Sequence, residues 1–441
     1  MRARLLLAMF FLLAPAAASA VEVQTLPAPK GEDIWFVEDH TLPMIAMSAA
    51  LPAGSAYDPK GKEGLAAFAA AMLDEGAGNL NSQAYHEALS DRAIRLSVTP
   101  GRDYTVITLV TLSENAKEAF RLLGLALSHP RFDPDAIARV RGQILTDIQG
   151  GQEEPETVAQ KAFFRAFFKG HPYGHPVDGD AASVGRIGRG DLQAFARGHW
   201  VRGGLKIAVA GDVSADDLAA LLGSAFDKLP NVTPAAIPPV RHMGAPGVIV
   251  VPMPVPQSTV IFGLPGIPRN DRDFIAAYVA NNILGGGDFS SRLMNEVREK
   301  RGLTYGISTN LLAYRRGGFV VGEVATRREA IRQTIDVLKK TVRQFAADGP
   351  TDRELADAKT YLTGSFPLAF SSNAGIAGQL STFQTQGLPA NYISRRNDLI
   401  NALTAADVKR AARRMFSGRL TIVVAGSVPA AAKPAARPQG H

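Results

Sequence analysis

The chain has 441 residues, of which 48 are Lys or Arg and 41 are Asp or Glu, so its formal net charge is +7. Basic and acidic residues are interspersed without a stripe of basic and aromatic side chains, which gives no support to nucleic-acid binding. The absence of cysteine excludes disulfides, a thiolate metal site and a cysteine nucleophile. At this length an ordinary apolar core is sufficient, and two to four domains are expected.

The first twenty residues have the pattern of a secretory signal peptide. Arg2 and Arg4 precede an uncharged apolar run over 5–14, and the small residues at 18–20 form the pattern that signal peptidase recognises. The run is too short to cross a bilayer as a helix, and no later stretch has the length and apolarity of a membrane anchor. We therefore expect 1–20 to be removed and the mature chain to be exported without a membrane span.

A weak internal repeat divides the rest of the chain into two halves. A short helix followed by a buried strand that ends on glycine is expected over 191–211, and the same pattern returns over 407–426. Because the copies lie about half the chain apart, they indicate two domains of one fold instead of a solenoid. Eight prolines lie between 229 and 257 and predict an extended linker, whose core is 233–246.

Within each half, short β-branched strands alternate with long helical patterns, which predicts an α+β fold. The tail over 429–441 consists mainly of Ala, Pro and basic residues and is expected to be disordered. The expected strands are 45–51, 104–112, 247–251, 258–264 and 318–325, and the expected long helices are 116–127 and 328–346.

A further helix is expected over 64–76, with Gly76 as its C-terminal cap. Its large apolar residues, from Leu65 to Leu73, fall on one side of the helix. The opposite side carries only alanine, at Ala67, Ala70 and Ala71. An exposed face normally carries Lys or Glu, so a bare alanine face indicates close packing or a cavity wall. From spacing alone, a tightly packed core helix is favoured.

The pattern Gly-Leu-Ala-x-Phe-x-x-x-Met-Leu in this helix resembles the active-site helix of the M16 (pitrilysin/insulinase-like) peptidases. In that family His-x-x-Glu-His supplies two zinc ligands on one helix face and a base that activates water. The resemblance places these three groups at Ala67, Ala70 and Ala71, and the third ligand at Asp147. One shortened carboxylate cannot hold zinc alone, so Asp147 is interpreted as a solvated helix-face residue.

The histidines offer no replacement site. Only His171 and His175 have ligand-like spacing, but Pro and Gly between them favour a loop, which also resembles a family loop of structural role. His86 lacks a second histidine at Ser90. We therefore predict no catalytic zinc in this chain.

A glycine run over 285–287 lacks the Gly-Lys-Ser/Thr ending of a phosphate loop. It predicts a turn, followed by a helix that is capped near Asp288 or Ser290 and ends at Gly302. The whole segment resembles the second M16 domain, Gly-Gly-x-x-Ser-Ser-Arg-Leu followed by Arg-x-Lys-Arg-Gly-Leu-x-Tyr. In active relatives an Arg and a Tyr of this segment reach the zinc site of the other domain.

The Arg and Tyr of that segment correspond to Arg298 and Tyr305. A guanidinium binds a peptide carbonyl or carboxylate with paired hydrogen bonds, and a phenol donates to the oxyanion that forms as water attacks. The break at Gly302 is expected to place Arg298 near a helix end and Tyr305 at the start of a strand.

The resemblance covers nearly the whole mature chain. It implies two homologous M16 domains over 21–232 and 247–428, each a mainly antiparallel sheet packed with helices. It also implies a periplasmic, heterodimeric zinc peptidase in which this chain contributes Arg298 and Tyr305, while a partner carries His-x-x-Glu-His and the zinc. The substrates would be peptides bound as an added strand at a sheet edge.

Other functions remain open from the sequence. The chain is alternatively a catalytically inactive M16-fold structural or chaperone subunit, and a homodimer is not excluded. An independent peptidase would need a nucleophile or metal cluster that the sequence does not contain.

Overall fold

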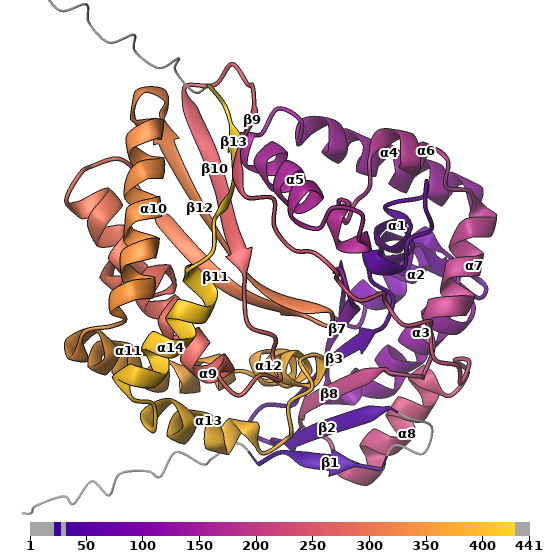
Figure 1. Cartoon of the computed structure of the whole chain (residues 1–441). Helices are drawn as coiled ribbons and strands as arrows, with labels where there is room; N and C mark the ends of the chain where they lie inside the picture. Colours follow the sequence, from indigo (N-terminus) through magenta and orange to yellow (C-terminus); the bar gives the residue numbers. More distant parts are fainter. Residues whose placement is uncertain (1–21, 28–31, 428–441) are drawn as a thin grey trace, which may run out of the picture.

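The computed structural model describes residues 22–27 and 32–427, so the expected signal peptide and C-terminal tail lie outside the described residues. The described chain forms two large sheets that lie side by side, one from each half (Figure 1). The first sheet has the order β1-β2-β8-β3-β7-β6. Its strands are β1 (Gln24–Leu26), β2 (Asp33–Glu38), β3 (Met44–Leu51), β6 (Arg95–Pro100), β7 (Thr105–Leu112) and β8 (Lys206–Gly211).

The second sheet repeats this arrangement. Its order is β11-β12-β10-β13-β9, which is the order of the first sheet without β1, read in reverse. Each sheet has one parallel pair, β2 with β8 in the first and β9 with β13 in the second, and the remaining pairs are antiparallel. The strands are β9 (Gly247–Val251), β10 (Gln257–Pro265), β11 (Ile307–Tyr314), β12 (Gly317–Arg327) and β13 (Thr421–Ala425). Two homologous α+β domains with mainly antiparallel sheets are thus confirmed.

Helices cover the sheets of both halves. The helices of the first half are α1 (Leu65–Ala71), α2 (Ser82–Ser90), α3 (Ala116–Ser128), α4 (Pro134–Gly150), α5 (Pro155–Phe167), α6 (Ala181–Gly185), α7 (Arg189–His199) and α8 (Ala215–Phe226). Those of the second half are α9 (Phe274–Asn281), α10 (Ile331–Asp348), α11 (Asp352–Gly364), α12 (Asn373–Thr385), α13 (Tyr392–Asn401) and α14 (Ala405–Phe416). In the described part of the chain, none of them has the length and apolarity needed to cross a membrane.

Glycine ends the last strand of both halves for a steric reason. Gly211 and Gly426 have φ values of +140°. A Cβ at Gly211 would lie 2.2 Å from the main-chain oxygen of Met44, and one at Gly426 would lie 2.2 Å from Oγ of Ser258. Any side chain would therefore collide with the neighbouring strand, which explains why the repeat in the sequence ends on glycine.

Each half sends one helix onto the sheet of the other half. Helix α5 packs against β10 and β13 of the second sheet, and α12 packs against β3 and β8 of the first (Figure 1). Phenylalanines of α5, including Phe163 and Phe167, form a core with Ile261 and Val423. Leu380 and other apolar residues of α12 pack on Trp35 in the same way. Because the two contacts are reciprocal, the apolar face of each sheet is completely buried only when the other half is present.

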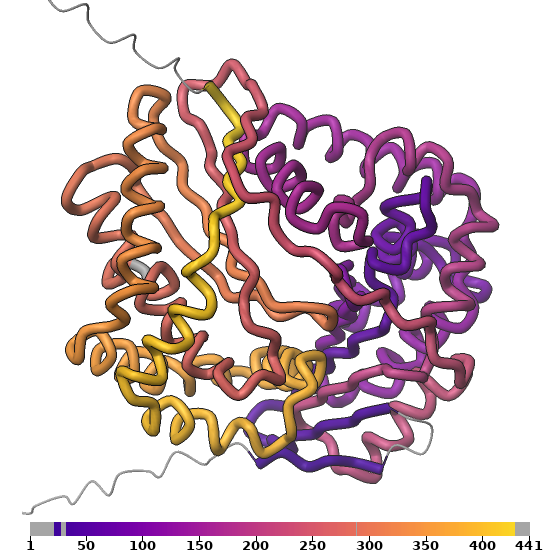
Figure 2. Tube along the Cα trace, viewed as in Figure 1, coloured from indigo at the N-terminus to yellow at the C-terminus, as the bar shows by residue number. Residues whose placement is uncertain are grey.

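The proline-rich segment crosses between the halves without forming a helix or a strand over 230–246 (Figure 2). Main-chain hydrogen bonds hold it in place: Gly203 N–H donates to Val232 O (3.1 Å), and Gly244 N–H donates to Phe167 O (2.8 Å). Nε2 of His171 lies 2.9 Å from Pro238 O. The segment is therefore an extended strap along the first half that leads into β9.

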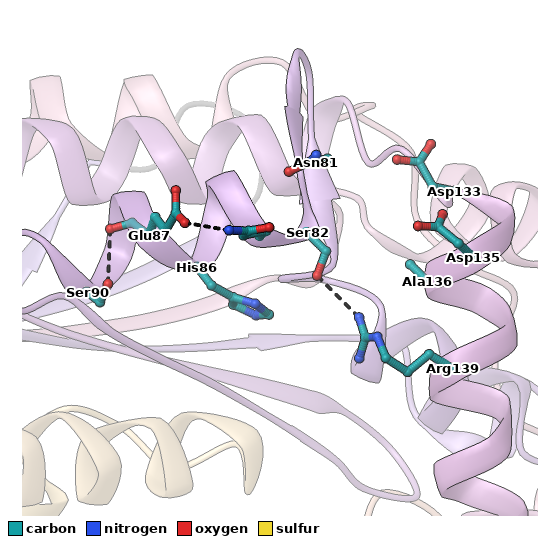
Figure 3. A pocket seen from close by; sticks show the side chains of 10 residues that line it. Asn81, Ser82, His86, Glu87, Ser90, Asp133, Asp135, Ala136 and Arg139 are labelled. Atoms are coloured by element: carbon teal, nitrogen blue, oxygen red, sulfur yellow. Dashed lines mark hydrogen bonds between the residues drawn. The ribbon is translucent and has the colours of Figure 1, made fainter.

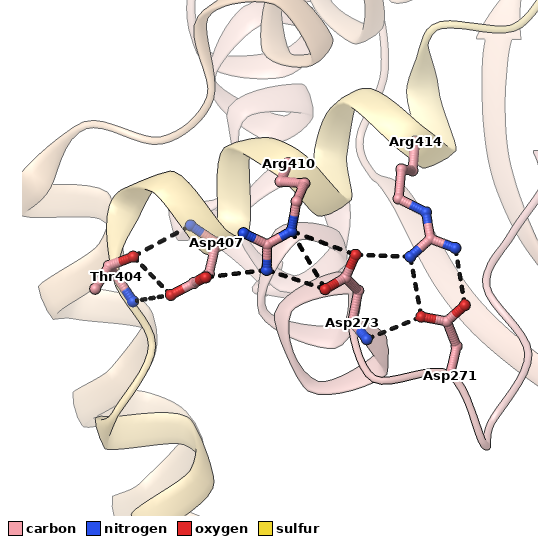
Figure 4. Close-up of polar contacts among 6 residues, drawn as sticks. All are labelled: Asp271, Asp273, Thr404, Asp407, Arg410 and Arg414. Carbon is pink, nitrogen blue, oxygen red and sulfur yellow. Dashed lines mark hydrogen bonds and ion pairs between the residues drawn. The ribbon is translucent and has the colours of Figure 1, made fainter.

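A network of ion pairs joins α14 to the loop that precedes α9 (Figure 4). Asp273 is almost fully buried and contacts both Arg410 (3.0 Å) and Arg414 (2.6 Å). Arg414 also pairs with Asp271 (2.8 Å), and its hydrogen bonds lower the pKa of Asp271 to about 2. These contacts hold α14, the last helix of the second half, against the start of α9, the first helix of that half.

Two expectations about helix boundaries were wrong. The helix expected over 64–76 ends at Ala71, and Gly76 starts the short hairpin of β4 (Gly76–Ala77) and β5 (Leu80–Asn81). The turn expected over the glycine run begins only at Gly287, whose O accepts from Ser290 N–H (3.2 Å), because the helix continues as a π-helix over Asn282–Gly286. A Cβ at Gly285 would lie 2.6 Å from Oγ1 of Thr309, so the glycines allow close packing on β11.

Candidate functional site

The alanine face of α1 forms the wall of a cavity. Ala67 and Ala71 line a space of about 900 Å³, and Asp147 near the end of α4 lines the same space. The lining also comes from the edge strand β6, from α5 and from the loop after 175. The structure thus brings together three of the four positions that the resemblance assigned to the zinc site. The fourth, Ala70, is 3% exposed and does not line the cavity.

The start of α1 is held by contacts that orient this face. The Asp58 carboxylate accepts hydrogen bonds from the main-chain N–H groups of Gly64 and Ala66, both at 2.8 Å. Burial raises the pKa of Asp58 to about 8, although these two hydrogen bonds act in the opposite direction. Gly64 has a φ of +95°, and a Cβ there would lie 2.5 Å from Asp178 O. Glycine at this point lets α1 begin directly against the loop that closes one side of the cavity.

Charges of both signs line the cavity. Asp147 is exposed and accepts a hydrogen bond from Nε2 of Gln143 (2.8 Å), as expected for a solvated helix-face carboxylate. Arg102 donates from Nη1 to His175 O (2.8 Å), and its guanidinium lies over the Phe164 ring. Burial lowers the pKa of Arg102. The other charged lining residues are Glu154, Lys161 and Asp178.

Arg298 lies at the end of a second π-helical segment, Met294–Glu299. Its Nη1 is 2.9 Å from Oε1 of Glu299, and its guanidinium carbon is 4.7 Å from the ring centre of Phe289, a side chain that is 67% exposed. Gly302 has a φ of +58° and donates its N–H to Arg298 O (2.8 Å), which ends the helix where the sequence predicted.

Tyr305 lies in the loop two residues before β11, and not at the start of the strand as expected. The side chain of Thr304 ties this loop to β12 by donating to Ala325 O (2.7 Å), and it accepts a hydrogen bond from the N–H of Gly306 (3.1 Å). Tyr305 itself is 89% exposed. Neither Arg298 nor Tyr305 lines the cavity beside α1.

Comparison with known proteins identifies the relationship. Residues 36–181 match the family model described as insulinase (peptidase family M16), and residues 186–362 match the one described as peptidase M16 inactive domain. The non-peptidase homolog YmxG of Helicobacter pylori is 28% identical over 410 residues, which cover 92% of each chain. A crystal structure of a peptidase M16 inactive domain from Pseudomonas fluorescens superposes with a TM-score of 0.88. It is 31% identical and covers 93% of this chain and 98% of its own.

The chain belongs to peptidase family M16.

The fold extends to a more distant structure, a protease from Helicobacter pylori, which has a TM-score of 0.81 at 18% identity and covers 92% of this chain and 99% of its own.

The cavity of this M16 chain does not fit zinc. Catalytic zinc needs three protein ligands. At least one of them is usually an imidazole nitrogen or a thiolate sulfur. The described lining residues include no histidine, and the two positions on α1 are methyl groups. We therefore derive no step of hydrolysis through a metal bound to this chain.

Elsewhere in the described chain, Asp74, Glu75 and His86 form a group whose ligand atoms lie within 4.8 Å of one another. Sequence reasoning missed it because only a second histidine one turn after His86 was sought. His86 lines a neighbouring pocket of about 630 Å³, where Arg139 contacts Ser82 (Figure 3). Arg139 also pairs with the buried carboxylate of Glu75, which accepts from Ser82 Oγ as well (2.5 Å). Arg139 therefore pairs with one of the two carboxylates of this group, and His86 lies 3.4 Å from the other, that of Asp74.

Proposed function

We propose that this M16 chain is the substrate-binding subunit of a heterodimeric zinc peptidase, to whose active site it contributes Arg298 and Tyr305. The partner is an M16 subunit that carries His-x-x-Glu-His and the zinc. The observation that carries the proposal is the exposure of Tyr305 on an anchored loop, in a chain whose own cavity has no histidine among its described lining residues.

Each of the two side chains is able to act on a substrate held by the partner. In the ion pair between Arg298 and Glu299, Arg298 is half-buried and Glu299 is exposed, and such surface pairs contribute only ~0–1 kcal/mol to stability. The guanidinium is therefore available to bind a peptide carbonyl or carboxylate with paired hydrogen bonds. The Tyr305 phenol donates one hydrogen bond to the oxyanion that forms when the partner's water attacks the peptide.

The cavity beside α1 supports a role in holding peptides. Strand β6 is the last strand of its sheet and pairs only with β7 among the described strands. Its residues Val98 and Pro100 line the cavity together with Ala67 and Ala71. A peptide that pairs with the free edge of β6 would run along this wall, where backbone hydrogen bonds give affinity without strict sequence requirements. Because this cavity has no histidines to hold zinc, the peptide is held and not cut.

The first experiment is isolation of the mature protein from its own cells, followed by identification of what co-purifies. We expect a stoichiometric partner that bears His-x-x-Glu-His, and zinc-dependent peptidase activity only in the pair. Cell fractionation is expected to place the pair in the periplasm. Recovery of the chain alone, or with proteins that lack the motif, contradicts the proposal and favours a structural or chaperone subunit.

The second experiment tests the two residues in the assembled pair. Tyr305→Phe is expected to lower kcat by about 10²-fold, the usual cost of one lost oxyanion donor, without preventing assembly. Arg298→Lys keeps the charge but loses the paired hydrogen bonds to the substrate, and it is expected to lower kcat/KM by about tenfold or more, also without preventing assembly. Tyr361→Phe and Arg353→Lys are the matched controls, since these side chains are exposed on α11. Full activity of both site variants in an assembled pair would leave only the structural or chaperone function.

A further inference from the structure

A basic pocket of about 460 Å³ lies where the two halves meet. Its walls are the loop at 268–270, the turn between β11 and β12, the end of α12, and two residues of the first half, Tyr104 and Lys206. None of the described lining residues is acidic, whereas four are cationic. The cations are Lys206, Arg269, Arg315 and Arg316.

The protein compensates this positive charge only in part, since the carboxylate of Asp103 attracts Arg315 without forming a close ion pair with its side chain. In the described part of the chain, a carboxylate lies within 4.0 Å of only one of these four side chains, Lys206, whose Nζ is 3.2 Å from Oδ2 of Asp33. Arg269 donates from Nε to the neutral amide oxygen of Gln386 (2.8 Å). Its guanidinium packs over Phe274, and burial lowers its pKa. Desolvated cations without counter-ions favour the binding of an anion.

The turn that carries two of the cations has an unusual composition. Tyr314 pairs with Gly317, so Arg315 and Arg316 are the only two residues of the turn. Two-residue hairpin turns favour Asn-Gly, which accepts positive φ, but neither arginine has a positive φ. Turn chemistry therefore does not explain the two arginines.

Contacts with the first half explain one of these arginines. Arg315 donates from its main-chain N–H to Asp103 (2.9 Å) and from Nη1 to the hydroxyl of Tyr57 (3.2 Å), and so it links the two halves. Arg316 makes no such link through Nε, which is buried without a hydrogen-bond partner in the described structure. Arg269 is held by Gln386 and by the Phe274 ring, but in the described structure neither Arg269 nor Arg316 has a carboxylate within 4.0 Å of its guanidinium.

We propose that this pocket binds an oxyanion between Arg269, Arg316 and Lys206. A guanidinium offers two parallel N–H donors to a carboxylate or phosphate, and two guanidiniums and an ammonium around one space suit a group with one or two negative charges. Two sources share this chemistry: the C-terminal carboxylate of a peptide, and free phosphate. Because residues of both halves line the pocket, a bound oxyanion also joins the halves. The proposal is independent of Arg298 and Tyr305.

The test uses the isolated full mature chain, without partner or zinc, so that its outcome does not depend on the proposed peptidase. Calorimetric titrations compare a short peptide with a free C-terminal carboxylate, the same peptide with a C-terminal amide, and inorganic phosphate. We expect the free-acid peptide or phosphate to bind, and the affinity to fall as ionic strength rises. The amide peptide is expected to bind at least about tenfold more weakly than the free acid, if the carboxylate is the ligand.

Substitutions locate the binding. Arg269→Gln and Arg316→Gln are each expected to raise Kd about tenfold or more, whereas Arg316→Lys, which keeps the charge, has a smaller effect. Arg353→Gln, on an exposed helix surface, is the control and leaves Kd unchanged. Thermal unfolding of each variant confirms that it is folded.

Binding of phosphate alone, or of the free-acid peptide alone, supports the site and identifies which of the two oxyanions is its ligand. The proposal is overturned if neither binds, if the two glutamine variants bind as the unmodified protein does, or if the acid and amide peptides bind equally while phosphate does not compete.

Discussion

At the scale of single residues, Ala67 and Ala71 lie one helical turn apart and face the same cavity as Asp147. Two histidines at these positions would have the i, i+4 spacing of a helical zinc site and would face the same cavity. This chain has a methyl group in place of each imidazole. The cavity of about 900 Å³ leaves room for two larger side chains. Ala70 is buried outside the cavity lining, so a glutamate there would place a charge in an apolar environment.

This geometry predicts a gain of metal binding. The double variant Ala67→His/Ala71→His is expected to bind zinc with Asp147 as third ligand, whereas the unmodified chain does not bind zinc at this cavity. Competition against a chromophoric chelator measures the affinity. Either single histidine variant should bind far more weakly, because it offers only two ligands. Equal zinc binding by single and double variants would show that α1 and α4 do not present these positions to one ion.

Two half-buried histidines make stability depend on pH. Burial lowers the pKa of His175 and His199 below the usual value of 6.5, so the folded state resists their protonation. Below pH 6.5 the unfolded chain binds more protons than the folded chain, and the free energy of unfolding therefore falls as the pH is lowered.

Urea unfolding at pH 7.5 and 5.5 measures this effect. We expect a lower midpoint at pH 5.5, and a smaller difference between the two pH values in His199→Phe, whose ring keeps the contacts with the Tyr57 and Phe195 rings without titrating. An unchanged difference in this variant would show that protonation of His199 does not contribute.

At the scale of elements, the reciprocal placement of α5 and α12 is the feature that holds the halves together. Phe163 of α5 is fully buried, stacks on Phe167 at 4.9 Å between ring centres, and contacts Gly263 of β10. A side chain on Gly263 would collide with this ring, since its Cβ would lie 2.6 Å from Cζ of Phe163. The surfaces of α5 in the first half and β10 in the second half are therefore complementary in shape.

Truncation of this contact should be costly. Phe163→Ala is expected to lower the free energy of unfolding by about 3–5 kcal/mol, because it removes a buried ring and leaves a cavity between the halves. Chemical denaturation measures the change. Arg165→Ala, on the exposed side of the same helix, should change stability by less than about 0.5 kcal/mol. A small effect of Phe163→Ala would show that α5 is not essential to the second sheet.

At the scale of the whole molecule, the two halves are expected to unfold together. Each sheet is covered in part by a helix of the other half, so unfolding of one half exposes the core of the other. Trp35 and Trp200 are the two tryptophans, and both lie in the first half. Their fluorescence therefore reports on the first half, while far-ultraviolet circular dichroism reports on both.

We expect the two signals to give coincident denaturant transitions in the isolated chain. A fluorescence transition separated from the circular dichroism transition would show that the halves are independent folding units. The same measurement on Phe163→Ala tests whether the α5 contact is what couples them.

Local patterns in the sequence determined much of this protein. The expected strands and long helices agree with the structure to within a few residues, because periodic burial and β-branching act over neighbouring positions. The repeat ending at Gly211 and Gly426 indicated the two-domain organisation. Two of the three alanines on the bare face of α1, Ala67 and Ala71, line a cavity, as one of the two interpretations of that face predicted. The expected export and the roles of Arg298 and Tyr305 remain predictions.

The tertiary structure alone decided three other features. It ended the helix after Ala71 and carried another helix through Gly286, because packing on neighbouring strands outweighs local turn preference. It placed α5 and α12 on the sheet of the opposite half, which no periodic pattern encodes. It also gathered Arg269, Arg316 and Lys206 into one pocket. These features depend on contacts between residues far apart in the chain, and the sequence pattern of a segment records only that one face is apolar, not which surface will cover it.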